Sequence, residues 1–160
     1  MLQIELICIG KLKEAFWKSA CTEYSKRLSR FCRLRVTELK DEAIPETASA
    51  AQVEHAVMAE GERILERLLP RDYVISLCVE GKPLSSPGLA KQLQDICQSG
   101  AGRLVFVIGG SCGLSEEVKK RSQFRLSFSA MTFPHQLMRV ILLEQVYRAF
   151  KINAGESYHK

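Results

Sequence analysis

The segment Leu-Val-Phe-Val-Ile-Gly-Gly-Ser-Cys-Gly-Leu at residues 104–114 is the most informative part of the sequence about the fold. Five consecutive apolar residues are typical of a strand buried on both faces of a parallel sheet. The glycines that follow permit positive φ and let a ligand approach the backbone closely. The pattern is neither a Walker loop nor G-x-G-x-x-G, because no G-K-[S/T] follows and the first two glycines are adjacent. It fits a binding turn, and it also fits a plain strand–helix turn.

Outward from this segment, strand and helix patterns alternate along the chain. Strands are predicted over residues 3–9, 34–39, 73–79, 104–108 and 124–128, and helices over 14–31, 50–69, 86–98, a short stretch from 115, and 134–152. This order predicts one α/β domain over residues 1–160, a mainly parallel sheet with helices on both faces. Ligands of such sheets bind beyond the carboxyl ends of the strands. We therefore expect the site in the loops after Val79, Ile108 and Phe128.

Composition excludes several classes of protein. The longest apolar stretches have five or six residues, far fewer than the ~20 of a membrane span, and the opening residues lack the features of a secretory signal. The six cysteines lack C-x2-4-C spacing, so we interpret them as structural or incidental thiols in a reducing cytoplasm. The three histidines lack H-x-x-x-H spacing, so no metal site is expected.

The net charge of +5 is unevenly distributed. Residues 1–40 contain nine Lys and Arg against four Asp and Glu, and residues 101–160 contain the same numbers, whereas residues 41–70 contain seven acids against two bases. Basic surfaces at both ends of the chain are suited to a polyanion such as RNA. Solvated helix faces in a mildly basic protein would give the same pattern.

A second candidate segment, residues 128–135, reads Phe-Ser-Ala-Met-Thr-Phe-Pro-His. Its small and hydroxyl residues expose backbone groups, and its Phe and Met residues offer apolar walls, which together suit a flat, uncharged adenine. Residues 126–134 contain no basic side chain, which argues against phosphate binding here and against an ATPase. The segment could also be a simple connection before a core helix.

Polar residues at the two ends of the last helical region are further candidates. His135 and Arg139 are four residues apart, so they share one helix face, where a histidine can transfer protons and an arginine can hold a phosphate. Tyr158 and His159 give the tail a stacking surface and a titratable group. A surface histidine and a frayed terminus are the alternatives.

Three motifs resemble the large-subunit ribosomal RNA methyltransferases of the SPOUT superfamily. They are Val-Phe-Val-Ile-Gly-Gly-Ser-x-Gly-Leu (105–114), Leu-Ser-Phe-Ser-x-Met-Thr-Phe-Pro-His-Gln-Leu-Met-Arg (126–139) and Leu-Glu-Gln-Val-Tyr-Arg-Ala-Phe-Lys-Ile (143–152), followed by a closing Tyr-His-Lys. The resemblance implies a C-terminal deep trefoil knot, a rare exception among folds, a homodimer and the methyl donor S-adenosyl-L-methionine. The implied reaction is methylation of N3 of a pseudouridine in 23S rRNA of the assembled 70S ribosome.

The resemblance also implies roles for individual residues. The donor contacts fall on Leu77, Gly109, Phe128, Ser129, Ala130, Met131, Thr132 and Phe133. Around the RNA we expect Arg139 to hold phosphate, Tyr158 to stack, and His159, rather than His135, to handle the proton. Lys160 stands where some relatives end in Arg, which keeps the charge but not bidentate recognition.

Two other functions remain open at this point. The first is a ribosome-binding factor with no catalytic activity, which would use the basic ends of the chain. The second is an enzyme acting on adenine nucleotides, which is weakened by the absence of a P-loop lysine and of clustered carboxylates for magnesium.

Overall fold

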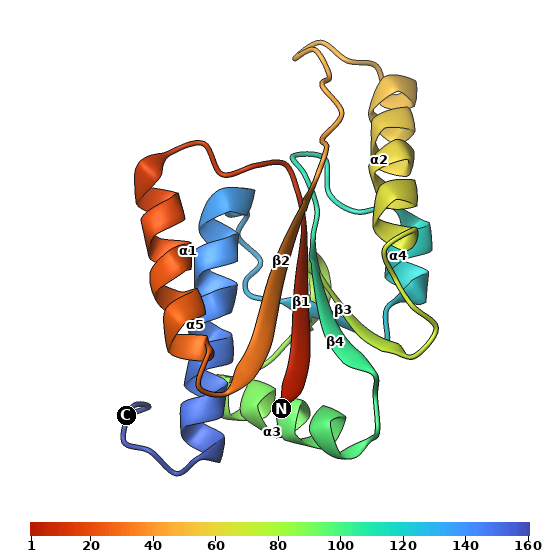
Figure 1. Ribbon diagram of the computed structural model, residues 1–160. Coiled ribbons are helices and arrows are strands. Elements are labelled where there is room, and N and C mark those ends of the chain that lie inside the picture. Colours follow the sequence, from red (N-terminus) through yellow and green to blue (C-terminus); the bar gives the residue numbers. More distant parts are fainter.

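The structure is a computed structural model that describes all residues, 1–160, and its strands and helices alternate along the chain (Figure 1). The elements are β1 Leu2–Ile9, α1 Ala15–Leu28, β2 Cys32–Leu39, α2 Ala50–Leu65, β3 Asp72–Pro83, α3 Ser86–Gln98, β4 Arg103–Ile108, α4 Glu116–Arg121, β5 Phe124–Ser127 and α5 His135–Asn153. Every expected strand and helix is present, which confirms the α/β prediction.

The five strands form one sheet in the order β2-β1-β4-β3-β5, and every neighbouring pair is parallel. The strand predicted over residues 104–108 lies in the middle of this sheet and is almost fully buried. Because parallel neighbours need crossover connections, helices return over both faces of the sheet. As Figure 1 shows, α1, α3 and α5 lie on one side and α2 and α4 on the other.

Alternate residues of the central strands supply two separate cores. Leu6 and Phe106 pack into the larger core with Leu142 of α5, whereas Ile7 packs with Ile64 of α2 in the smaller one. Successive side chains of a strand point to opposite faces, so continuous apolar runs are needed where helices cover both. The partly apolar circumference of α5 follows from its place between α1 and α3 over the larger core.

The third strand extends beyond its predicted end at residue 79. We expected the strand to stop at Val79 and a turn to follow, but β3 continues to Pro83. Its register with β5 shifts, because Leu77 and Lys82 both pair with Leu126. Residues 78–81 therefore bulge out of the sheet. A Cβ atom at Gly81 would lie 2.7 Å from the Arg125 carbonyl oxygen, so only glycine allows this close return.

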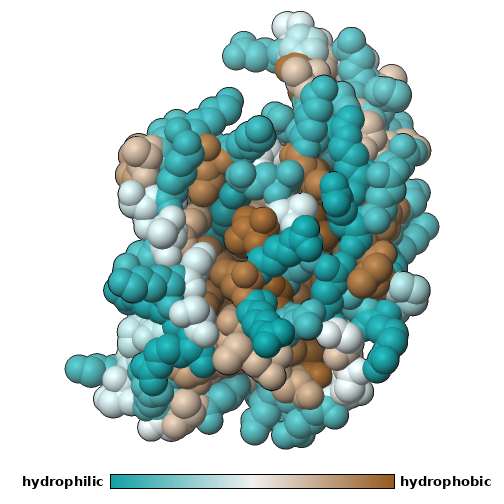
Figure 2. Space-filling view, in the orientation of Figure 1, coloured by the Kyte–Doolittle hydropathy of each residue, from teal (hydrophilic) through white to brown (hydrophobic).

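The strand β2 forms one edge of the sheet, and its exposed side chains are mostly polar. Arg33 and Arg35 are exposed along it, and Val36 is 39% exposed. Figure 2, in the same orientation as Figure 1, shows apolar surface near the middle of this face with polar side chains around it. Charged side chains on an edge strand discourage pairing with other chains.

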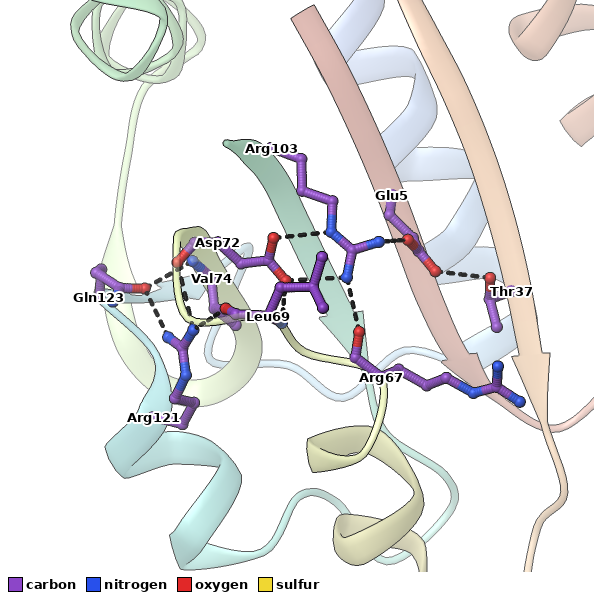
Figure 3. Close-up of polar contacts among 9 residues, drawn as sticks. All are labelled: Glu5, Thr37, Arg67, Leu69, Asp72, Val74, Arg103, Arg121 and Gln123. Atoms are coloured by element: carbon purple, nitrogen blue, oxygen red, sulfur yellow. Dashed lines mark hydrogen bonds and ion pairs between the residues drawn. The ribbon is translucent and has the colours of Figure 1, made fainter. Parts of the chain in front are cut away.

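A buried polar cluster closes the amino-terminal end of the sheet (Figure 3). Arg103 at the start of β4 donates from Nε to Asp72 Oδ1 at 2.8 Å and from Nη2 to the Arg67 carbonyl at 2.6 Å, and it forms an ion pair with Glu5. The Leu69 amide donates to the other Asp72 oxygen at 2.7 Å. This cluster joins β1, β3 and β4 at the end opposite to the predicted site.

The six cysteines are all free, and Cys8, Cys21 and Cys32 are buried among apolar residues. Burial raises the pKa of the Cys8 thiol to about 12, so this side chain stays protonated and packs as a small apolar group. No group of three potential metal ligands is present, and no helix is both long and apolar enough to cross a bilayer.

Candidate functional site

A cavity of about 670 Å³ lies at the carboxyl ends of β3, β4 and β5. Its walls come from residues 77–80, from residues 108–114 and from residues between 126 and 135, so the three loops expected from the sequence meet here. The predicted donor residues that line it are Leu77, Gly109, Phe128, Ser129, Met131, Thr132 and Phe133. Ala130 is exposed and is not part of the lining.

The glycine turn forms one wall of this cavity. Gly110 and Gly113 face each other in an isolated antiparallel bridge, and the Gly113 amide donates to the Gly110 carbonyl at 3.1 Å. A Cβ atom at Gly109 would lie 2.8 Å from the Gly113 carbonyl oxygen. The turn is therefore folded too tightly for a side chain at this position, which leaves backbone groups exposed to the cavity.

The segment after β5 forms the opposite wall and is held by its own hydroxyl groups. Ser127 donates to the Ser129 carbonyl at 3.1 Å, and the Ser129 hydroxyl accepts from the Met131 amide at 3.0 Å. The Met131 side chain is 74% exposed although it is large and apolar. An apolar side chain at the mouth of a cavity can cover a ligand that enters it.

His135 begins α5 and lines the same cavity. Burial, and after it the charge of Arg139, lowers the pKa of His135 below its usual 6.5. The imidazole is therefore neutral near pH 7, and one ring nitrogen is able to accept a proton. The amide of Lys13 donates to Gln136, which ties the β1–α1 loop to this helix start.

Arg139 is buried at the start of α5 and pairs with residues of the chain itself. Its Nη1 donates to Glu38 Oε2 at 2.7 Å, its Nη2 to the Gly10 carbonyl at 3.3 Å, and its side chain is 3% exposed. Burial acts to raise the pKa of Glu38, but hydrogen bonds from Arg139 and from the Leu12 amide outweigh it and lower this pKa. In this structure the guanidinium joins α5 to the end of β2, and the expected contact of Arg139 with phosphate stays a prediction.

The tail residues lie far along α5 from the cavity of their own protomer. Tyr158 donates from its hydroxyl to Glu144 at 3.1 Å and packs edge-on against Tyr147, and His159 Nδ1 lies 3.4 Å from Arg148 Nη1. These partners are nine to thirteen residues beyond His135, which is about 14–20 Å along a helix. Within one chain, the four predicted RNA-facing residues are therefore not brought together.

Comparison with known proteins adds an independent observation to this geometry. Residues 2–159 match the sequence model of the family described as "Predicted SPOUT methyltransferase". The chain belongs to the SPOUT methyltransferase family. It is also 54% identical over 159 residues to the ribosomal RNA large subunit methyltransferase H of Clostridium novyi (strain NT), covering 99% of this chain and 100% of that protein.

Two solved structures show that the fold of this SPOUT chain is shared at low sequence identity. A probable methylase family protein from Haemophilus influenzae Rd KW20 aligns with a TM-score of 0.55 and 14% identity, over 98% of this chain and 70% of that one. A probable methyltransferase from Bordetella pertussis Tohama I aligns with a TM-score of 0.56 and 16% identity, over 92% and 94% of the two chains.

Sequence reasoning missed several polar residues that the SPOUT fold places at or behind the cavity. Glu80 and Lys119 line it, and Glu38 anchors Arg139. Glu60 of α2 reaches the back of the glycine turn, where a Cβ atom at Gly110 would lie 3.1 Å from its carboxylate. No spacing rule could have paired them, because Glu80 and Lys119 are 39 residues apart and Glu38 and Arg139 are 101 residues apart in the sequence.

Proposed function

We propose that this chain methylates ribosomal RNA of the large subunit with S-adenosyl-L-methionine as the methyl donor. The observation that carries the proposal is the cavity at the carboxyl ends of the strands, whose walls are the glycine turn and the 128–135 segment. Membership of the SPOUT methyltransferase family and the name of the Clostridium novyi relative support the same reaction.

The walls of the cavity fit an adenosyl donor. Eleven of its 21 lining residues are hydrophobic, which suits the faces of a purine. The tight turn at Gly109, where a Cβ atom would lie 2.8 Å from the Gly113 carbonyl oxygen, builds the neighbouring wall from backbone groups. When bound, the donor supplies an electrophilic methyl group on a sulfonium. The residues that would hold it are Leu77, Gly109, Phe128, Ser129, Met131, Thr132 and Phe133. Their part is to align the donor and exclude water.

The finer substrate assignment is N3 of a pseudouridine in 23S rRNA on the assembled 70S ribosome. An imide-type N3 must lose its proton as it is alkylated, so a proton acceptor is needed beside it. His159 stays our first candidate, with Tyr158 stacking on the base. His135 is the alternative, since it is neutral and already lines the cavity.

We further propose a homodimer in which the tail of one protomer completes the site of the other. The separation of Tyr158 and His159 from their own cavity supports this arrangement. A second support is the partly exposed apolar surface of α5, which includes Leu137 and Ile141. The C-terminal trefoil knot is likewise proposed; residues 128–134 connect the edge strand β5 to α5, and most of them line the cavity at the carboxyl ends of the strands. The cytoplasm, where ribosomes assemble, is the proposed location.

Calorimetry with S-adenosylhomocysteine, followed by methyl transfer to 70S ribosomes, free 50S subunits and naked 23S rRNA, tests the proposal. We expect saturable binding of the product and a methylated pseudouridine, detected by nucleoside mass spectrometry, with 70S ribosomes as the best substrate. Binding to ribosomes without methyl transfer would support the non-catalytic alternative instead. Absence of any cofactor binding at saturating concentration would refute the proposal.

A further inference from the structure

One ion pair stands at the wall of an otherwise uncharged cavity. Lys119 Nζ of α4 pairs with Glu80 of the β3 bulge and lies 3.4 Å from Glu116 Oε1. Glu80 and Lys119 are among the residues that line the cavity, whereas Glu116 is not. The Lys119 side chain is 14% exposed and that of Glu80 is 54% exposed. The lysine is therefore fixed in the wall, and the carboxylate lies at the rim with free acceptor capacity.

The position of Glu80 depends on the irregularity of β3. Residues 78–81 leave the sheet between the two pairings with Leu126, and the contact of Gly81 with the Arg125 backbone fixes where they return. A regular strand would instead keep residue 80 in the ladder with β5. The bulge is thus the feature that brings a carboxylate to the donor cavity, and a β-bulge beside a site commonly redirects a side chain in this way.

The Glu80 carboxylate is ionised and already has cationic neighbours. The hydrogen bond from Lys119 is the largest cause that lowers the pKa of Glu80, and the charge of Arg125 acts in the same direction. These two cations disfavour a third one, so the ammonium group of the donor is a poor partner here. The adenine amine is also a poor partner, since a purine needs the apolar walls further inside rather than a half-exposed rim.

We propose that Glu80 accepts hydrogen bonds from the two neighbouring hydroxyls of the donor ribose, and that Lys119 positions the carboxylate for this contact. A carboxylate has two oxygens side by side, which match two adjacent hydroxyl donors, and acidic residues serve this purpose in nucleotide sites of other α/β proteins. The inference rests on the proposed use of S-adenosyl-L-methionine, and it adds a residue that determines recognition of the sugar.

A calorimetric cycle between protein variants and ligand analogues tests this contact. The variants are Glu80→Gln, the matched control Glu116→Gln, and Lys119→Met with Lys119→Arg. The ligands are S-adenosylhomocysteine, its 2′,3′-dideoxyribose analogue and an analogue that lacks the adenine 6-amino group. Thermal unfolding of each variant verifies that it is folded, as expected for side chains at a cavity rim.

We expect Glu80→Gln to weaken binding of S-adenosylhomocysteine roughly tenfold and to leave binding of the dideoxy analogue unchanged, because a hydrogen bond to a charged group is lost only where the hydroxyls exist. Glu116→Gln should bind both ligands like the wild type. Lys119→Met should weaken binding of S-adenosylhomocysteine, and Lys119→Arg should restore most of it.

Three results would overturn the assignment. In the first, Glu80→Gln binds S-adenosylhomocysteine as tightly as the wild type does. In the second, it loses as much affinity for the dideoxy analogue as for S-adenosylhomocysteine. In the third, its loss of affinity disappears with the analogue that lacks the 6-amino group, which would place the contact at the adenine. In each case wild-type binding and methyl transfer persist, so the proposed function stands and the ribose contact alone fails. If the wild type binds none of the three ligands, the proposed function fails and the ribose contact fails with it.

Discussion

The guanidinium of Arg139 lies 2.7 Å from the carboxylate of Glu38, and this contact joins the first turns of α5 to the end of β2. The same arginine donates to the Gly10 carbonyl, and Glu38 accepts from the Leu12 amide. His135, one turn earlier on α5, is thereby held at the edge of the cavity at the carboxyl ends of the strands. Residues distant in the sequence thus fix the position of a candidate catalytic side chain.

We expect Glu38→Gln to destabilise the fold more than Arg139→Met does. The glutamine leaves a buried guanidinium without a counter-charge, at a cost of about 3–5 kcal/mol, whereas methionine leaves only a carboxylate that water reaches. The double variant should recover part of the loss. Urea unfolding of the two single variants and the double variant measures this coupling, and additive losses would show that the pair is not coupled.

Arg103→Lys should destabilise the chain by about 2–4 kcal/mol, because a lysine cannot replace the paired donors that reach Asp72 and the Arg67 carbonyl. Since the cluster lies at the amino ends of the strands, binding of S-adenosylhomocysteine by the folded variant should not change. Lys91→Met is the control, as its ion pair with Asp95 is exposed and should contribute less than about 1 kcal/mol. Equal losses of unfolding free energy in Arg103→Lys and Lys91→Met would contradict a larger contribution from the Arg103 cluster.

Glu60 should make the fold less stable as pH rises. Burial is the largest cause that raises its pKa above the usual 4.5, although the Glu42 amide donates to it. The folded state therefore retains a proton that the unfolded state has released, and stability present below pH 4.5 is lost as pH rises through the folded pKa. We expect Glu60→Gln to be more stable than the wild type at pH 8, and the difference to shrink toward pH 4.5. Glu62→Gln, exposed on the same helix, should show no such trend.

His159→Ala should lower the single-turnover rate with saturating ribosomes by roughly 100-fold, the scale of a lost acid–base group. The single-turnover rate of His135→Gln is measured for comparison. Because the pKa of His135 is below 6.5, any effect of its protonation on the rate belongs below that pH, where the charged imidazole no longer accepts a proton. A full rate in His159→Ala together with a loss in His135→Gln would assign the proton step to His135.

Heterodimers that combine a cavity variant with a tail variant should regain activity that neither homodimer has. Gly109→Ala forces a Cβ atom to within 2.8 Å of the Gly113 carbonyl and should close the cavity, and His159→Ala removes the tail imidazole. If the site is shared, one of the two sites in each heterodimer contains neither change. Differently tagged subunits purified in two steps provide the sample, and absence of rescue there would argue against a shared site.

Much of the fold could be predicted because the information is local. The apolar run 104–108 specifies a buried strand, and the serine and proline before residue 88 mark the start of α3, although the cap is Ser85 rather than the expected Ser86. The bulge at residues 78–81 could not be predicted. A glutamate and a glycine after an apolar strand look like a turn, and only the backbone of β5 shows that the chain returns to the sheet.

Part of the candidate site could be predicted from local segments, and part of it could not. Ser129, Thr132 and Gly109 could be proposed from their segments because small and hydroxyl residues expose the backbone wherever they occur. The place of Arg139 could not be found from its four-residue spacing to His135, since that spacing gives a shared face but not what the face contacts. Glu38, 101 residues earlier in the sequence, determines that contact.

The sequence by itself therefore determined which segments become strands, which become helices and which loops gather at one end of a parallel sheet, since periodicity and turn chemistry act over a few residues. The tertiary structure alone decided which polar groups meet: Arg139 with Glu38, Lys119 with Glu80, and the Tyr158 hydroxyl of the tail with Glu144. Burial makes such pairing compulsory, because a charge removed from water needs a partner, but any element that packs nearby can supply it.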